Sequence, residues 1–367
     1  MKNFVFTSES VCAGHPDKVA DQISDALVDA VLAQDPNGKV AIETLVTKDC
    51  IVLAGETKSK AKIDPEKIAR EQIKRLGYTL PELDFTHTSP ITLKIHAQSP
   101  EIATGVEKKG AGDQGMMFGF AVDETAELMP LPITLAHTLA RKIDEARIQN
   151  LIPHLRPDGK TQVTLEYKNN IPIKVKSVIL AIPHSEKSQR EEILDAAYEK
   201  IVTPVLGKYD LSFKKKDVIL NGTGVWHYSG PAADTGVTGR KIIVDTYGGY
   251  ARVGGGAFSG KDPTKVDRSA AYAARFLAKN IVAQKLAKKV EVSLAFFIGA
   301  NSPTMLEIET FGTEKKSHKT ILDFASTLLD CSVQGILDGL SLRRPIYLPT
   351  AAYGHFGNPL YPWEQIV

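Results

Sequence analysis

Hydrophobic and polar positions along the chain follow a helix, hairpin, helix order that appears three times. Apolar side chains at helical spacing give way to runs in which every second residue is apolar, and these two periods predict helices and strands. The first set is a helix over 16–33, strands over 40–46 and 51–55, and a helix over 65–76. The second is a helix over 133–148, strands over 162–167 and 173–182, and a helix over 188–202. The third is a helix over 263–288, strands over 291–298 and 304–310, and a helix over 319–329.

These three sets predict an α+β fold made of three similar α/β units, in which helices pack on mostly antiparallel sheets. The amino acids themselves do not repeat, so the period is one of elements rather than of sequence. Breaks near 100–112 and 222–230 divide the chain into an N-terminal unit (1–100), a central unit (111–228) and a C-terminal unit (229–367). The segment 101–110 between the first two is either a mobile gating loop or a plain linker.

Composition narrows the class of protein. The chain has 367 residues, of which 43% are hydrophobic and 24% charged, as in ordinary globular proteins. A net charge of +2 gives no reason to expect a nucleic-acid surface. Three cysteines without metal-binding spacing, and no signal peptide or run of ~18 apolar residues, predict a reduced, cytoplasmic protein without membrane spans.

The stretch 254–268 carries the strongest chemical signal. Its four glycines allow backbone N–H groups to approach an anion, and a following helix adds partial positive charge at its N-terminus. Asp262 and Pro263 suit the N-cap and first position of that helix, while Lys261 and Lys265 add full charges. The Walker A pattern fails, because Asp262 stands where a Ser or Thr should hold Mg²⁺. The stretch is either a polyphosphate cradle of another type or a glycine-rich hairpin before an ordinary helix.

Two shorter motifs place acids beside a helix start or glycines. His15 and Asp17 flank Pro16 at the start of the first predicted helix. Asp17 either complements the helix dipole or binds Mg²⁺, and His15 either caps the helix or, as a cation, stabilises charge on a leaving oxygen. Asp113 lies within the glycine-rich run 110–115, which is either a turn or a bend that faces a ligand.

Three further sites combine charge with a turn or a strand. Asp158-Gly159-Lys160 reads as a turn before a strand. Arg240 and Lys241 precede a predicted strand over 242–245, and they suit either phosphate contact or a solvated basic pair. Glu43 interrupts an apolar strand, and a buried acid needs a partner, a metal or a ligand.

Taken together, these motifs resemble the S-adenosylmethionine synthetases (methionine adenosyltransferases), in the bacterial type of catalytic chain. The resemblance spans nearly the whole chain and is carried, in order, by residues 9–18, 110–115, 238–242, 254–268 and 353–357. It implies that the methionine sulfur attacks C5′ of ATP and releases triphosphate, which is then hydrolysed to pyrophosphate and phosphate. It also implies three domains about a pseudo-threefold axis, two Mg²⁺ per site, K⁺, and homodimers with shared active sites that pair into a tetramer.

The resemblance further implies a set of site residues. The catalytic residues are His15, Asp113, Lys160, Arg240 and Lys261. Those that bind ATP are His15, Asp158, Gly159, Lys160, Val225, Trp226, Asp234, Arg240, Lys241, Ala257 and Lys261. Those that bind methionine are Glu56, Gln98, Asp113, Asp234 and Lys265. Asp17 and Asp267 are the Mg²⁺ carboxylates, and Glu43 binds K⁺.

The chain departs from the family pattern in three places. The loop after Gln98 is shorter than in many bacterial members, Val225-Trp226 stands where the family often has Arg-Phe, and Asn358 stands where a basic residue is frequent. Trp226 keeps an aromatic face for adenine, whereas the arginine charge is absent. Two other hypotheses are an ATP-using kinase or phosphohydrolase and a non-catalytic nucleotide-binding subunit. The second is disfavoured because the cationic and acidic residues of the motifs are retained.

Overall fold

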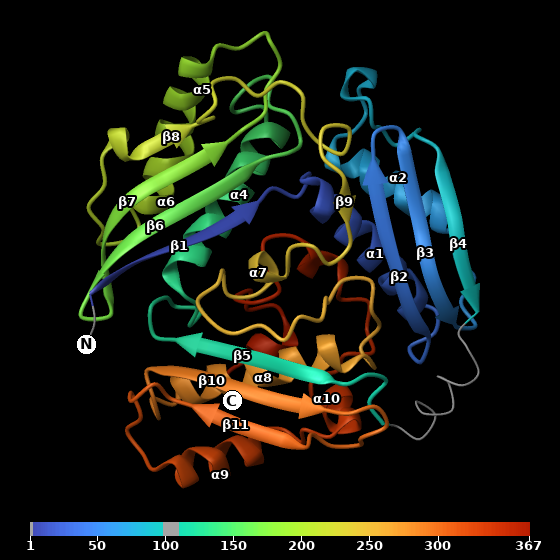
Figure 1. Cartoon of the computed structure of the whole chain (residues 1–367), viewed down its shortest axis with the longest axis vertical. Helices are drawn as coiled ribbons and strands as arrows, with labels where there is room; N and C mark the ends of the chain where they lie inside the picture. The colour runs from blue at the N-terminus through green and yellow to red at the C-terminus, as the bar shows by residue number, and fades with distance from the viewer. Residues whose placement is uncertain (1–2, 98–109) are drawn as a thin grey trace.

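Three β-sheets surround a group of helices in the computed structural model, which describes residues 3–97 and 110–367 (Figure 1). The first sheet has the order β4-β3-β2-β9 and consists of β2 (Lys39–Thr47), β3 (Cys50–Lys58), β4 (Ile91–Ala97) and β9 (Gly236–Val237). β2 is antiparallel to β3 and β9, whereas β4 is parallel to β3. Helix α1 (Pro16–Leu32) packs on β2, and α2 (Pro65–Leu76) packs beside α1.

The second sheet has the order β1-β6-β7-β8, formed by β1 (Phe4–Val11), β6 (Lys160–Lys168), β7 (Ile171–Ala181) and β8 (Val218–Leu220). The pairs are antiparallel except for β7 and β8. Helix α4 (Leu131–Ile148) packs on β1 and β6. A helical run follows as α5 (Arg190–Ala197), a π-helical turn (Tyr198–Val202) and α6 (Thr203–Leu206).

The third sheet has the antiparallel order β11-β10-β5, formed by β5 (Gly115–Val122), β10 (Lys289–Phe296) and β11 (Met305–Glu309). Helix α8 (Val266–Ala283) packs on β5 and β10, and α9 (His318–Leu328) and α10 (Val333–Gly339) contact α8. The short helix α7 (Ile242–Asp245) lies between the sheets, near the centre of Figure 1. Short 3₁₀ turns occur at Pro81–Leu83, Lys215–Asp217, Leu348–Ala351 and Pro362–Glu364.

Each sheet contains one strand from a different part of the chain. β1 from the N-terminus pairs with β6, β5 pairs with β10 near the C-terminus, and β9 pairs with β2. The three sets of elements are therefore interlocked rather than strung along the chain. Nearly every residue of α1 and α8 is buried, since both helices lie between the sheets and not on the surface.

Most predicted elements are present, and the α+β class with its three units is confirmed at that level. Two local predictions are wrong. Residues 242–245 are helical rather than a strand. The last long helix begins at Val266 with Lys265 at its N-cap position, three residues after the predicted start at Pro263. Asp262 lies before the N-cap position, and its carboxylate has both local and distant partners. Its Oδ1 accepts from the Thr264 amide at 2.9 Å, and its Oδ2 accepts from the Val40 amide at 2.8 Å and from Lys265.

Candidate functional site

The N-terminus of α1 holds His15 in a buried position. His15 is 1% exposed, and its Nδ1 accepts a hydrogen bond from the Asp17 amide at 3.2 Å. Because Nδ1 is an acceptor, the hydrogen of the neutral ring is on Nε2. Burial, with the nearby Lys241 and Lys160 ammonium groups, lowers the pKa of His15 to about 3. In the free protein this pKa favours the neutral ring, with Nε2–H as its donor, and the cationic interpretation of His15 stays a prediction for the substrate-bound site.

Asp17 connects this helix end to the segment that carries two predicted phosphate ligands. Its Oδ1 accepts from the Val237 amide at 3.0 Å, and its Oδ2 accepts from Lys241 Nζ at 2.5 Å. Arg240 Nε lies 3.6 Å from Oδ1. Burial would raise the pKa of Asp17, but the hydrogen bonds from Lys241 and Val237 outweigh it, and the pKa is lowered overall. Asp17 is therefore a carboxylate, surrounded by two cations.

The glycine-rich stretch is attached to strand β2. Gly260 O accepts from the Ile42 amide at 3.1 Å, and the Asp262 amide donates to Val40 O at 3.0 Å. Gly260 has a φ of 85°, which a side chain at this position would strain. The stretch therefore runs beside β2 as an extra backbone partner, and it presents Lys261 at that strand.

Lys261 forms an ion pair with Asp267 in the first turn of α8. The Nζ–Oδ2 distance is 2.6 Å, and both side chains are partly exposed. A Cβ on Gly256 would lie 2.3 Å from the Asp267 carboxylate, so the loop passes directly over that acid. Asp267 is thus next to a glycine backbone and a lysine, as a residue of an anion or metal–phosphate site would be.

A cavity of about 190 Å³ brings together five of the predicted site residues, Glu43, Glu56, Asp113, Lys261 and Lys265. Its remaining lining residues are Ala41, Ile42, Gly112, Ser259 and Gly260. Two strands of the first sheet, the glycine-rich bend before β5 and the 254–268 stretch therefore meet at one place. The expectation that Glu43 is buried is wrong, since strand alternation turns Ile42 and Thr44 inward and leaves Glu43 exposed on the opposite face.

The Asp158-Gly159-Lys160 turn has a structural part and an exposed part. Asp158 is buried and accepts from the Gly159 and Gly230 amides at 2.7 and 3.0 Å, and burial raises its pKa to about 6. A Cβ on Gly159 would lie 2.6 Å from Cys12 Sγ, so only glycine fits there. Lys160 is exposed at the start of β6 and contributes to the field at His15.

Residues predicted to contact the nucleoside lie on exposed or partly exposed segments. Val225 is 58% exposed, and the indole N–H of Trp226 donates to Tyr228 O at 2.9 Å. Asp234 is exposed, and its amide donates to Gly230 O. Ala257 touches the loop that precedes Arg240, because a Cβ on Gly239 would lie 2.4 Å from Ala257 Cβ. Gln98 and residues 101–109 of the predicted gating loop lie outside the described residues.

Ten of the predicted residues thus fall into two groups within one protomer. The "phosphate group" gathers at the start of α1 and consists of His15, Asp17, Lys160, Arg240 and Lys241. The "cavity group" consists of Glu43, Glu56, Asp113, Lys261 and Lys265. Among the described residues, the cavity lining includes no member of the phosphate group.

Sequence reasoning missed a set of buried charges behind both groups. They are Lys18, Asp21, Asp25, Asp245 and Arg268. All five are buried and form two sets of ion pairs, Lys18 with Asp21 and Asp245, and Arg268 with Asp25. The sequence did contain a signal, which is an aspartate at every fourth residue of α1 from Asp17 onward.

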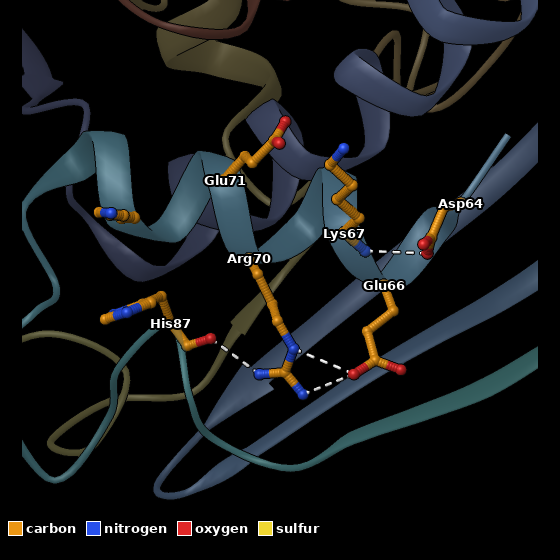
Figure 2. A pocket seen from close by; sticks show the side chains of 7 residues that line it. Asp64, Glu66, Lys67, Arg70, Glu71 and His87 are labelled. Carbon is orange, nitrogen blue, oxygen red and sulfur yellow. Dashed lines mark hydrogen bonds and ion pairs between the residues drawn. The ribbon is translucent and has the colours of Figure 1, made fainter.

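A second hollow, of about 470 Å³, lies on the outer side of α2 (Figure 2). It is lined by Asp64, Glu66, Lys67, Arg70, Glu71, Lys74 and His87. Arg70 donates to Glu66 at 3.0 and 2.8 Å and to His87 O at 2.7 Å, so its guanidinium is already satisfied. The hollow contains none of the predicted site residues, and we do not assign chemistry to it.

Among the described residues, no group of three or more His, Cys, Asp or Glu side chains is placed to hold a metal ion by itself. No single described helix is long and apolar enough to cross a membrane, and only α9 and α10 taken together, with a bend of 68° between them, reach that length and composition. Cys12, Cys50 and Cys331 are not paired with one another in the structure.

Comparison with known proteins gives matches along nearly the whole chain. Three family models match consecutive segments and are described as the N-terminal (3–100), central (108–226) and C-terminal (228–365) domains of S-adenosylmethionine synthetase. The chain is similar to the S-adenosylmethionine synthase of Clostridium tetani (strain Massachusetts / E88), with 47% identity over 379 residues. That alignment covers 99% of this chain and 97% of the relative.

Proposed function

We propose roles for the two groups of side chains, from the premise that this chain belongs to the S-adenosylmethionine synthetase family and makes S-adenosylmethionine from ATP and methionine. In this reaction the methionine sulfur attacks C5′ of ATP and the whole triphosphate leaves. The triphosphate is then hydrolysed to pyrophosphate and phosphate. The observation that carries the proposal is the cavity in which Glu43, Asp113 and Lys261, from separate motifs, converge.

The phosphate group would stabilise the leaving triphosphate. Lys160, Arg240 and Lys241 supply positive charge close to His15. His15 would donate its Nε2–H to the ribose O5′ as the C5′–O bond breaks. Because the ring is neutral before substrate binds, its contribution is a directed hydrogen bond, and triphosphate beside it would favour the protonated form.

The cavity group would bind methionine. Glu56 and Asp113 offer carboxylates to its ammonium group, and Lys265 offers an ammonium to its carboxylate. The thioether sulfur is already a nucleophile and needs no base, so these contacts act by holding it in line with C5′. Gln98 would complete this site, and Asp234, Trp226 and Ala257 would contact the nucleoside. Lys261 would bind the polyphosphate from the cavity side.

Mg²⁺ and K⁺ are the metal ions we propose, and the donor chemistry fits them. Mg²⁺ in phosphate sites commonly takes one or two carboxylates and completes its shell with phosphate oxygens and water. Asp17 and Asp267 are single carboxylates, each beside a predicted phosphate-binding lysine, so each would hold one Mg²⁺ with substrate present. Glu43 would hold K⁺. Such ions neutralise charge that develops on the phosphate oxygens.

We propose that a complete active site forms between two protomers, with the phosphate group of one facing the cavity group of the other. In one chain the two groups are separate, and Glu43 of the cavity group lies on the exposed face of β2, opposite the buried Ile42. Two such dimers would form the tetramer. Size measurement by light scattering tests the assembly, and mixing an inactive phosphate-group variant with an inactive cavity-group variant should restore activity in hybrid dimers.

We also propose that the three domains are related by a pseudo-threefold axis and that the protein works in the cytoplasm. Superposition of the three sheets with their helices tests the first proposal. Cell fractionation tests the second.

Mass spectrometry of products tests the function itself. Protein is incubated with ATP, L-methionine, Mg²⁺ and K⁺, with a methionine-free control. S-adenosylmethionine, pyrophosphate and phosphate should form only when methionine is present. Formation of ADP, or equal ATP loss without methionine, would contradict the proposal and favour a kinase or phosphohydrolase. Nucleotide binding without turnover would favour a non-catalytic subunit.

A further inference from the structure

Four aspartates on α1 each accept backbone hydrogen bonds from the C-terminal part of the chain. They are Asp17, Asp21, Asp25 and Asp29, which follow one another every four residues and so lie along one face of the helix. Their partners, in the same order, are the amides of Val237, Gly239, Gly260 and the pair Tyr347 and Leu348. Three of these four attachments lie in the segments that carry the predicted phosphate-binding cations.

Asp21 holds the start of the segment that bears Arg240 and Lys241. Its Oδ1 accepts from the Gly239 amide at 2.8 Å, directly before Arg240. Gly239 has a φ of 79°, so the backbone turns sharply there. Asp21 is fully buried and is paired with Lys18, whose Nζ lies 2.9 Å from Oδ2.

Lys18 also holds the end of the same segment. Its ammonium donates to Asp245, the last residue of α7. The Asp245 amide in turn donates to Lys241 O at 2.8 Å. One buried ammonium, through two carboxylates, therefore fixes both ends of the stretch that contains Arg240 and Lys241.

Asp25 makes the corresponding attachment for Lys261. Its Oδ1 accepts from the Gly260 amide at 2.9 Å and from Arg268 at 2.6 Å. Arg268 is completely buried, and besides this pair it donates to Lys261 O at 3.0 Å. The buried pair of Asp25 and Arg268 therefore holds the backbone of Lys261 on both sides, through the Gly260 amide before it and its own carbonyl oxygen.

We propose that Asp21 and Asp25 are positioning residues for the triphosphate, which hold the cations of the two loops in place through the backbone of Gly239 and Gly260. The inference rests on the proposed phosphate role of Arg240, Lys241 and Lys261. A buried helix is a rigid support, and four residues correspond to ~6 Å along its axis, so the two attachment points keep a fixed spacing. Neither aspartate touches substrate in this assignment.

Asp21→Ala tests the proposal, with Asp29→Ala as its matched control. Both changes remove a carboxylate from the same face of α1 and leave backbone N–H groups without an acceptor. Asp29, however, holds Tyr347 and Leu348, which carry no predicted phosphate ligand. The readouts are kcat and KM for ATP and for methionine, binding of inorganic tripolyphosphate by calorimetry, and thermal unfolding.

Asp21→Ala should lower kcat and the affinity for tripolyphosphate by at least ~10-fold, because the cations are displaced. In Asp21→Ala, KM for methionine should stay within about 2-fold of the wild-type value. Asp29→Ala should lower the unfolding temperature, while its kcat and its affinity for tripolyphosphate stay within about 2-fold of wild type. Equal kcat and tripolyphosphate affinity in the two variants would overturn the positioning role.

Should Asp21→Ala not accumulate as folded protein, Asp21→Glu against Asp29→Glu takes its place. The longer side chain keeps the charge beside Lys18 but moves the acceptor for Gly239, so kcat should again fall only in the Asp21 variant. Unchanged kcat in Asp21→Glu would overturn the proposal. Failure of the proposed function would show separately, in wild-type protein that binds no tripolyphosphate and makes no S-adenosylmethionine.

Discussion

Gly256→Ala should disable the enzyme by displacing one carboxylate. The added Cβ would lie 2.3 Å from Cγ and Oδ1 of Asp267, whereas ordinary contact begins at 3.4 Å. The carboxylate must therefore retreat by about 1.1 Å, the difference between these two distances. That movement lengthens the 2.6 Å pair between Lys261 and Asp267 and shifts the proposed Mg²⁺ carboxylate. Since a misplacement of ~1 Å in an active site can cost about 100-fold, we expect kcat/KM for ATP to fall by that factor.

Folding should be little affected by this change. Gly256 does not have a positive φ, so alanine adds no backbone strain, and Asp267 is partly exposed and has room to turn. We therefore expect the free energy of unfolding to change by less than ~1 kcal/mol, as is common away from the core. Urea unfolding measures this change in the free energy of unfolding independently of the enzyme kinetics.

Two other glycines separate the clash from general effects of alanine. Gly222→Ala has neither a positive φ nor a neighbour within 4 Å and should leave both kcat/KM and stability unchanged. Gly255→Ala meets no atom within 4 Å but has a φ of 91°, so it adds backbone strain without a clash. Activity of Gly256→Ala within about 3-fold of wild type, with the fold intact, would show that the position of Asp267 does not matter and refute the reasoning.

Three further predictions concern charge. Lys241→Met removes the ammonium beside Asp17 and should lower kcat by ~10²-fold while the circular dichroism spectrum is unchanged; a loss below 3-fold in steady-state kinetics would exclude a role in the reaction. Burial lowers the pKa of both His15 and His137 to about 3, so between pH 6.5 and 3 the unfolded chain binds more protons than the folded protein. The unfolding temperature should therefore fall as the pH decreases through this window. His137→Gln should make the unfolding temperature depend less steeply on pH. Arg275→Met removes the guanidinium from the buried Glu364, which keeps only the Lys279 ammonium as a charged partner beside the Gly357 amide. It should cost about 3 kcal/mol in urea unfolding, with unchanged kcat in the folded fraction.

Local signals explain where prediction from sequence succeeded. Helix α2 was predicted with its observed bounds, because Asp64 caps it, Pro65 opens it and Gly77 closes it in the left-handed conformation. Each of these signals lies within a few residues of the helix and needs no tertiary contact. The boundaries of the three units at 100, 111 and 228 stay predictions.

Long-range contacts explain where it failed. The run Ile242, Ile243 and Val244 favours a strand by propensity, yet hydrogen bonds to Asp245 at its end hold it as a helix. Asp262 has the residue type of an N-cap, and its Oδ1 accepts from the Thr264 amide, but its Oδ2 accepts from the amide of Val40, 222 positions earlier. The pairing of β1 with β6, β5 with β10 and β9 with β2 could not be predicted either, because no local pattern specifies the partner of a strand.

The same distinction applies to the site. Short motifs of glycines, lysines and acids were enough to select five charged residues that line one cavity, although their roles stay predictions. Their partners were not predictable, as the pair of Asp17 and Lys241 shows, because these residues are 224 positions apart in the sequence. The period-two rule alone places Glu43 opposite Ile42, so its exposure was predictable, and the apolar neighbours in its strand misled the interpretation.

Helix α1 links the stability of the protein to its proposed catalysis. Its apolar side chains belong to the main core, so the helix is held by domain packing and not by the substrate. Its aspartates lie on another face and accept hydrogen bonds from the backbone N–H groups of Val237, Gly239 and Gly260. These hydrogen bonds restrain the segments next to the proposed phosphate-binding cations. Buried charges such as Asp21 and Lys18 are costly to desolvate, and they add little net stability compared with apolar residues of the same size. Their placement is better explained by what they hold, which is the backbone next to Arg240, Lys241 and Lys261.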